Sequence, residues 1–228
     1  CIRDSSRFVP SVAGYAYASR GSALYVNLFV NSELSVNTEG GELIISQKTD
    51  YPWDGHVELD FLNDKEVESE LHIRMPGWAM NTPVPSDLFY FANEQVREPL
   101  LKVNGEKVEF QMDKGYAIVQ GEWKHGDRLT LELPMEDRLI KAHEKVEAKA
   151  GLLAVQYGPL VYCAEEIDNE TDVLEAELSS NSGFEAQFDP GLLGGVNMLR
   201  GEELSLIPYY AWANREVGKM NVWFKQID

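Results

Sequence analysis

The chain has 228 residues, with 38 Asp and Glu against 20 Lys and Arg, and a formal net charge of −18. Its 44% apolar and 11% aromatic residues exclude a disordered acidic tail, and its length suits one large all-β unit or two small domains. A pI near 4.6 argues against nucleic acid as a partner, because phosphate binding needs a stripe of Lys and Arg. No apolar run approaches the ~20 residues of a membrane span, so no membrane partner is expected. The chain begins at Cys1 and not at Met, which we interpret as a piece of a longer protein.

The first twenty residues predict a short helical stub. Phe8, Val12 and Tyr15 recur at helical spacing, and the helix is expected to end near Arg20 and Gly21.

From residue 23 onward, apolar and polar residues alternate with a period of two. Turn signals recur about every 8–12 residues, and the strongest is Asn104-Gly105, since both positions tolerate a positive φ. This rhythm is typical of a β-sandwich or barrel. Strands are expected at residues 24–30, 34–37, 41–48, 56–61, 68–74, 102–103, 107–110, 116–120 and 129–133.

Later segments are less regular. Residues 80–99 contain three prolines and the run Phe89-Tyr90-Phe91, and they predict a long surface loop. Residues 135–149 are highly charged and predict a partly extended linker. The apolar stretch 151–166, broken by Gly158-Pro159, predicts two short strands or one bent strand. After an acidic, glycine-rich loop, strands are expected at residues 204–210 and 220–225.

The predicted fold class is all-β: two packed antiparallel β-sandwich units, jelly-roll-like, with a short N-terminal helical stub. Residues 1–20 form the stub, residues 21–135 the first sandwich and residues 136–218 the second. The last strand, 219–227, is left open as one that could return to the first sandwich.

Common catalytic motifs are absent from the sequence. The four histidines lack metal-site spacing, and there is no Gly-x-Ser-x-Gly elbow, phosphate loop or Asp-x-Asp-x-Asp calcium loop. Neighbouring carboxylates such as Glu165-Glu166 and Glu136-Asp137 are expected by composition in so acidic a chain. We therefore assign no catalytic residue.

Aromatic residues near strand ends are the better functional signal. Sugars stack on aromatic faces, so Trp53, Trp78 and Trp123 are candidate carbohydrate contacts. The alternative for each is that the indole fills a core or a seam between domains.

The two cysteines, Cys1 and Cys163, cannot make a disulfide framework. Cys163 lies in an apolar run and is expected to be a buried free thiol. A thiolate at Cys1 could ligate zinc, but a single cysteine cannot close a metal site.

A set of motifs occurs along nearly the whole chain. They are Arg7, Tyr15 and Tyr17; Leu24-Tyr25-Val26-Asn27-Leu28; Gln47-Lys48-Thr49-Asp50-Tyr51-Pro52-Trp53; Arg74-Met75-Pro76-Gly77-Trp78; Val103-Asn104-Gly105-Glu106; Trp123 with Gly126-Asp127; Gly158-Pro159-Leu160-Val161-Tyr162; and Ile207-Pro208-Tyr209-Tyr210-Ala211-Trp212-Ala213-Asn214-Arg215, with Met220 and Trp223. In this order they resemble the β-L-arabinofuranosidases of glycoside hydrolase family 127.

The resemblance implies that an (α/α)₆ catalytic barrel precedes this region, with residues 1–20 as the remnant of its end. In that family one of two adjacent cysteines is the nucleophile, and the other helps to hold zinc. Cys1 aligns with the second of the pair, so it is a candidate zinc ligand only when the upstream barrel is present. No cofactor is then expected in this chain, and zinc only in the parent protein. The parent is expected to be secreted or periplasmic and to act on plant-type arabinose-containing glycans.

Three functions remain open on these grounds. The first is a non-catalytic region whose partner is the parent's barrel. The second is an autonomous carbohydrate-binding module that uses the tryptophans, and the third is a structural or interaction domain.

Overall fold

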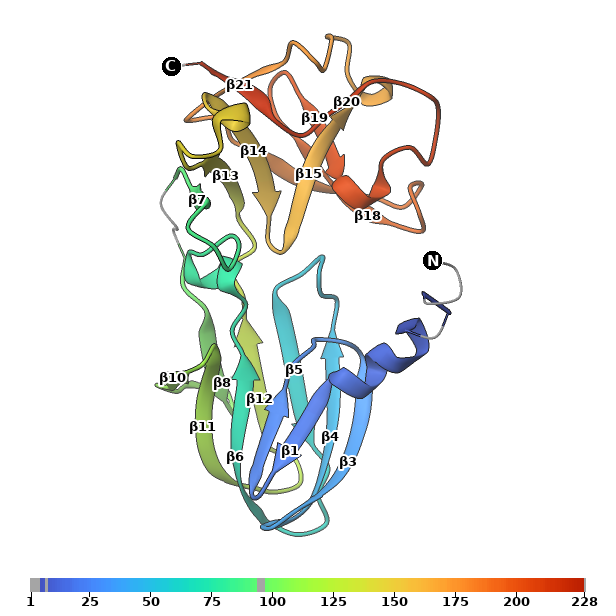
Figure 1. Cartoon of the computed structure of the whole chain (residues 1–228). Helices are drawn as coiled ribbons and strands as arrows, with labels where there is room; N and C mark the ends of the chain where they lie inside the picture. Colours follow the sequence, from blue (N-terminus) through green and yellow to red (C-terminus); the bar gives the residue numbers. More distant parts are fainter. Residues whose placement is uncertain (1–4, 7, 94–96, 228) are drawn as a thin grey trace. The chain divides into compact units, whose positions relative to one another are not determined.

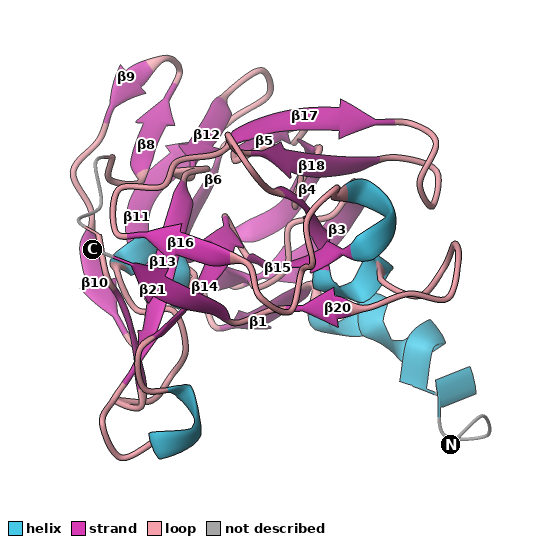
Figure 2. Ribbon diagram, turned by 90° about the horizontal axis from the view of Figure 1, so that it is seen from above, coloured by secondary structure: helices cyan, strands magenta, loops and turns pink. Residues whose placement is uncertain are grey.

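The computed structural model describes residues 5–6, 8–93 and 97–227. It divides into two compact units, each built from two stretches of chain. Unit 1 comprises Cys1–Pro76 and Pro99–Leu133, and unit 2 comprises Gly77–Glu98 and Pro134–Asp228. The protein is all-β: strands dominate both units, and the helical segments are short (Figures 1 and 2). No helix among the described residues is long and apolar enough to cross a membrane.

Among its described residues, unit 1 contains two sheets and the 3₁₀ helix η1. Its elements are η1 (Val9–Tyr15), β1 (Tyr17–Arg20), β2 (Ala23–Val26), β3 (Ser32–Thr38), β4 (Gly41–Thr49), β5 (His56–Phe61), β6 (Val67–Arg74), β8 (Leu100–Val103), β9 (Glu106–Lys107), β10 (Gln111–Asp113), β11 (Tyr116–Trp123) and β12 (Arg128–Glu132). The five-stranded sheet has the order β1-β2-β6-β11-β10, and the six-stranded sheet has the order β3-β4-β5-β12-β8-β9. Neighbouring strands are antiparallel except β2 and β6, which are parallel.

The core of unit 1 follows from the alternation of side chains along each strand. On β5, Val57, Leu59 and Phe61 point inward and are at most 2% exposed, while the residues between them face solvent. Phe61 stacks on Trp123 of β11 with ring centroids 4.4 Å apart, so the inner faces of the two sheets are in contact. Burial of each large apolar side chain contributes roughly 1.5–3 kcal/mol.

Unit 2 is built on one ten-stranded sheet. Its elements are η2 (Gly77–Met80), β7 (Phe89–Phe91), β13 (Asp137–Ala142), η3 (Glu147–Lys149), β14 (Leu152–Tyr157), β15 (Leu160–Glu165), η4 (Glu166–Asp168), β16 (Glu177–Ser179), β17 (Glu185–Asp189), β18 (Val196–Arg200), β19 (Ser205–Pro208), η5 (Tyr209–Ala211), β20 (Met220–Asn221) and β21 (Phe224–Ile227). The main path is β16-β21-β14-β15-β19-β18-β17. β13 pairs with β14 and β7, and β20 pairs with β15. A separate core includes Leu153, Val155, Tyr162, Leu206 and Phe224.

The N-terminal helix ends earlier than the sequence predicts. η1 ends at Tyr15, and the following residues form β1, which pairs with β2 through a turn at Gly21. Gly21 has a φ of 64°, a conformation that glycine adopts without steric cost. The pairing of β1 with β2 thus outweighs the weak helical periodicity of this segment.

Residues 77–98 group with unit 2, whereas residues 80–99 were expected as a surface loop within the first sandwich of residues 21–135. β7 in this segment pairs with β13, and the Arg138 guanidinium lies 3.9 Å from the centre of the Phe91 ring. The interpretation of residues 135–149 as a linker is also wrong, because they contain the strand β13.

The last strand does not return to the first sandwich. β21 pairs with β14 and with β16, both of unit 2. Phe224 is fully buried in the unit 2 core, and this burial holds the strand there.

Candidate functional site

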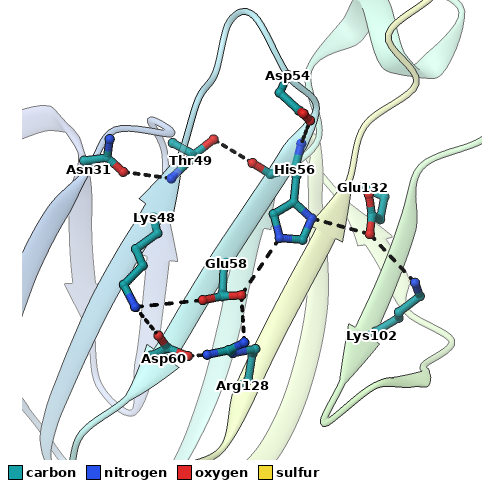
Figure 3. Close-up of polar contacts among 10 residues, drawn as sticks. All are labelled: Asn31, Lys48, Thr49, Asp54, His56, Glu58, Asp60, Lys102, Arg128 and Glu132. Carbon is teal, nitrogen blue, oxygen red and sulfur yellow. Dashed lines mark hydrogen bonds and ion pairs between the residues drawn. The ribbon is translucent and has the colours of Figure 1, made fainter.

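A strip of charged side chains crosses the outer face of the six-stranded sheet in unit 1 (Figure 3). The residues come from β4, β5 and β12, where they alternate with inward-facing apolar residues. Asp60 accepts from Lys48 Nζ at 2.8 Å and from Arg128 Nε at 2.7 Å. Arg128 Nη1 also lies 2.9 Å from Glu58 Oε2. The strip therefore alternates acidic and basic groups across three neighbouring strands.

His56 and Glu132 extend this strip toward β8. His56 Nδ1 lies 3.4 Å from a Glu132 oxygen, and Lys102 Nζ lies 3.8 Å from the same oxygen (Figure 3). These side chains are about half exposed, so each pair contributes little to stability by itself.

The electrostatics of the strip centre on Asp60. Burial alone would raise the pKa of this carboxyl, but hydrogen bonds from Lys48 and Arg128 outweigh burial and hold the pKa below its ordinary value. The same hydrogen bonds raise the pKa of Lys48 and of Arg128. All three groups are therefore charged throughout the physiological range.

A groove of about 340 Å³ opens at one end of the strip, beside the turn that carries Trp53. Its lining is polar and consists of Asn31, Lys48, Thr49, Asp50, Asp54, His56 and Glu58. These carboxylate, amide and hydroxyl groups can accept hydrogen bonds from a hydroxylated ligand, and the amide and hydroxyl groups can also donate to it.

Side-chain hydrogen bonds fix the backbone around this groove. Asn31 Oδ1 accepts from the Thr49 amide at 2.8 Å, and Thr49 Oγ1 donates to the His56 carbonyl at 2.7 Å (Figure 3). Asp54 Oδ1 accepts from the His56 amide at 2.7 Å. The turn is also closed by the Trp53 amide, which donates to the Asp50 carbonyl at 2.9 Å.

The three candidate tryptophans are in different environments. Trp53 is half-buried in its turn, and Asp54, the residue after it, lines the groove. Trp123 is 2% exposed, and its Nε1 donates to the Ser69 carbonyl at 3.1 Å. An indole packed in this way presents no face to a sugar, so Trp123 is a core residue and the expectation of a carbohydrate contact fails there.

Trp78 belongs to unit 2, whereas the other two candidates belong to unit 1. Its Nε1 is buried without a hydrogen-bond partner. The indole lines a cavity of about 10 Å³ together with Phe91, Pro134, Glu136, Arg138 and Gly158. That volume is about the size of one water molecule, so this cavity does not admit a sugar ring.

Exposed aromatic residues also occur on the η5 loop of unit 2. Tyr209, Tyr210 and Trp212 are 46%, 52% and 40% exposed. The loop is anchored by Arg215, whose Nη2 lies 2.5 Å from Glu165 and 2.5 Å from Asp168.

His72 is buried although it lies on an outward strand face. The His72 side chain is on the outer face of β6, but it is only 6% exposed because its ring stacks on Tyr25 at 4.2 Å. Tyr116 packs edge-on against the same pair and covers it further.

Cys1, the candidate zinc ligand, lies outside the described residues. Within the described ranges, no three His, Cys, Asp or Glu side chains converge as a metal site would need. Cys163 is a buried free thiol, as expected, and burial raises its pKa to about 12.

The charged strip and the groove at its end were not predicted from the sequence. The signal was present, because period-two alternation puts Lys48, Glu58 and Asp60 on outer faces. Only the strand register, which sets Asp60 opposite Arg128 and Ser46, shows that the charges meet.

Comparison with known protein families gives two matches that are adjacent along the chain. Residues 23–135 match the model of the β-L-arabinofuranosidase GH127 middle domain, and residues 137–225 match the glycoside hydrolase family 127 C-terminal domain. The chain belongs to glycoside hydrolase family 127.

Individual relatives in this family agree with the assignment. The chain is 31% identical to a non-reducing end β-L-arabinofuranosidase of Bifidobacterium longum, over 98% of this chain and 36% of that protein. A solved GH127 β-arabinofuranosidase is 35% identical with a TM-score of 0.91, and the match covers 97% of this chain and 38% of the other.

A second solved structure, Ara127N-Se, is a GH127 β-L-arabinofuranosidase from Geobacillus stearothermophilus T6. It is 34% identical with a TM-score of 0.85, and the match covers 98% of this chain and 37% of the other. The chain thus spans little more than a third of the length of these relatives.

Proposed function

We propose that this chain is a non-catalytic region of a family 127 glycoside hydrolase, and that hydrolysis requires further polypeptide outside it. One observation carries the proposal. The two family matches are to the middle and C-terminal domains and occupy nearly all of the chain, while the relatives are almost three times as long.

The N-terminal segment has exposed apolar side chains, which favour contact with another part of the longer protein. η1 buries none of its residues, and the apolar side chains of Val9 and Tyr15 are 66% and 60% exposed. Phe8, just before the helix, is 60% exposed. An apolar helix of this kind is stable where another surface covers it, and we propose that the catalytic barrel of the longer protein provides that surface.

The relatives' names indicate the substrate class that we propose for the longer protein, which is β-L-arabinofuranosides. In that protein zinc would keep a cysteine deprotonated at neutral pH. The two β units would act by stabilising the barrel and by forming part of the approach to its site.

The test compares the 228-residue chain with the longer protein in hydrolysis of an aryl β-L-arabinofuranoside, with zinc present in both assays. We expect no turnover by the chain and turnover by the longer protein. Turnover by the purified chain above that of a heat-denatured sample would overturn the proposal.

A second candidate function is saccharide binding at the groove beside Trp53. Its polar lining of about 340 Å³ and the half-buried indole in the adjoining turn favour it. Calorimetry with arabino-oligosaccharides would then give binding that Trp53→Ala removes and Trp53→Phe largely retains. Trp212→Ala, at an exposed position in unit 2, is the matched control and should bind normally.

A further inference from the structure

A cavity of about 500 Å³ in unit 2 is larger than the groove beside Trp53. It opens between the turn that follows β16 and the segment that joins β18 to β19. Its lining is Glu177, Leu178, Ser179, Asn181, Ser182, Gly183, Phe184, Gly201, Glu202, Glu203, Leu204 and Ile227. The volume is within the range of about 300–1,000 Å³ that is usual for small-ligand sites.

The apolar part of this cavity belongs to the core of unit 2. Leu178 and Leu204 are 5% and 4% exposed, and Phe184 packs against the same cluster. The Phe184 ring lies against Gly201, where an added Cβ would be 2.9 Å from a ring carbon. A glycine at position 201 therefore allows the ring to lie close to the backbone, and the ring is held in one place.

The turn on the opposite side is also fixed by hydrogen bonds. Ser182 Oγ accepts from the Ser179 amide at 3.0 Å, and the Ser182 amide donates to the Ser179 carbonyl at 3.1 Å. The Phe184 amide donates to Asp137 Oδ2 at 2.9 Å. Because the walls are ordered before a ligand arrives, binding would cost little conformational entropy.

The charge of the lining selects the kind of ligand. Glu177, Glu202 and Glu203 contribute three carboxylates, and the lining contains no Lys or Arg. Anionic ligands are therefore disfavoured by like-charge repulsion. Within the described residues the carboxylates do not converge as a metal site, but they can each accept a hydrogen bond from a hydroxyl group.

A second groove of about 420 Å³ adjoins this cavity across the turn. It shares Asn181, Ser182 and Gly183 with the first and adds Asn93, Arg97, Glu136, Asp137 and Ser180. Arg97 Nε lies 3.1 Å from Glu136 Oε1, so this part of the lining is also net acidic. The two spaces share the lining of this turn and are together called the cleft; having two adjoining spaces suits a chain of several units better than a single compact molecule.

We propose that this cleft, lined by the turn of residues 179–184, binds a neutral oligosaccharide. The aromatic face of Phe184 and the apolar floor contact the sugar ring, while the carboxylates and Asn181 accept from its hydroxyls. Binding here needs no other part of a longer protein and uses none of the candidate tryptophans, so the site goes beyond the proposed function.

The test is a titration of the ¹⁵N-labelled 228-residue chain followed by NMR. The probes are arabinotriose and cellotriose, with trigalacturonic acid as the anionic counterpart. We expect at least one neutral trisaccharide to give saturable shifts of the amides of residues 179–184 and 201–204 at millimolar concentration. Trigalacturonic acid should give none.

Variants of the lining test the contacts. Glu203→Ala and Asn181→Ala should each weaken binding roughly fivefold, as expected for the loss of one hydrogen bond. Phe184→Leu should weaken it further, and its NMR spectrum shows whether the fold is retained. Glu170→Gln, at an exposed position outside the cleft, is the matched control and should bind as the wild type does.

The inference would be overturned by no saturable shift with either neutral probe, or by equal binding of trigalacturonic acid. Shifts confined to residues 48–58 would also overturn it and would favour the groove beside Trp53. The outcome is independent of the hydrolysis assay, so failure here and failure of the proposed function are distinguishable.

Discussion

At the residue scale, burial decides which chemically distinctive side chains are accessible. From the sequence, Trp53 and Trp123 were equally good candidates for carbohydrate contacts. In the structure Trp53 is half-buried in a turn, whereas Trp123 is enclosed between two sheets. Cys163 likewise is a potential nucleophile by residue type only, because its side chain is fully buried.

Cys163 is expected to be unreactive in the folded protein. Burial is the main cause that raises its pKa to about 12, and the nearby carboxylates of Glu165 and Asp168 add to it. Iodoacetamide at pH 8 should therefore label Cys163 only after denaturation, as read by peptide mass spectrometry. A Cys1→Ser variant removes the other thiol as a control. Rapid labelling of Cys163 in the native chain would contradict the expectation.

The tryptophans differ in what their removal costs. Trp123→Ala leaves a cavity beside Phe61 and should lower the free energy of unfolding by about 3–5 kcal/mol. Trp53→Ala should lower it by about 1 kcal/mol or less, because that position is on a turn. Urea unfolding followed by circular dichroism measures both. Equal losses for the two variants would show that the assignment of Trp123 to the core is mistaken.

At the scale of elements, strand register turns an ordinary alternating pattern into an interacting surface. β5 lies between β4 and β12, so the acids on its outer face meet bases from both neighbours. The turn after β4 then places the polar groove at the end of this strip. The site therefore depends on the pairing of three strands, which no single strand sequence contains.

The lowered pKa of Asp60 predicts how this strip responds to acid. A carboxyl whose pKa is lower in the folded state stabilises the protein above its unfolded pKa of about 3.9, and this contribution is lost as pH falls through the folded value. Asp60→Asn should therefore lower the Tm at pH 7, and the difference from wild type should shrink below about pH 4.

Thermal unfolding between pH 3 and pH 7 measures this difference. Asp64→Asn, at an exposed position, is the control and should leave the Tm almost unchanged at every pH. A constant gap between Asp60→Asn and wild type over the whole range would show that the carboxylate charge is not what stabilises the strip.

At the scale of the whole molecule, each unit is made from two separate stretches of chain. Residues 77–98 belong to unit 2, although residues 99–133, which follow them in the chain, belong to unit 1. Asn81 Oδ1 and the Asn93 carbonyl each accept from Arg138 Nη2 at 2.8 Å, and Asn93 Oδ1 accepts from the Leu139 amide. Arg138 is only 5% exposed, so loss of these acceptors would leave a buried charge poorly solvated.

This arrangement predicts that residues 134–228 do not fold cooperatively alone. A splice in which a flexible Gly/Ser linker replaces residues 99–133, and so joins residues 77–98 to residues 134–228, should restore a sharp unfolding transition. Calorimetry of the two polypeptides distinguishes these outcomes. A cooperative unfolding transition of residues 134–228 in the absence of residues 77–98 would show that residues 77–98 are not needed for unit 2 to fold.

Structural features that depend on residues close together in the chain could be predicted from the sequence, and features that depend on distant contacts could not. The strand periodicity from residue 23 onward and the hairpin at Asn104-Gly105 follow from local backbone preferences, and both are present in the structure. Membership in family 127 could also be predicted, because motifs that resemble those of the family occur in the same order along the chain. The helical reading of Tyr17–Arg20 failed because pairing with β2, a contact outside the segment, outweighed a weak periodicity.

The sequence alone thus determined the all-β class, the family and a shortlist of side chains. The tertiary structure alone decided that residues 77–98 belong to unit 2, that Trp123 is enclosed, and that acids and bases of three strands meet beside a groove. The physical reason is the same in each case. Alternation and turn preference act between near neighbours, whereas burial, register and the joining of distant segments depend on contacts between residues far apart in the chain.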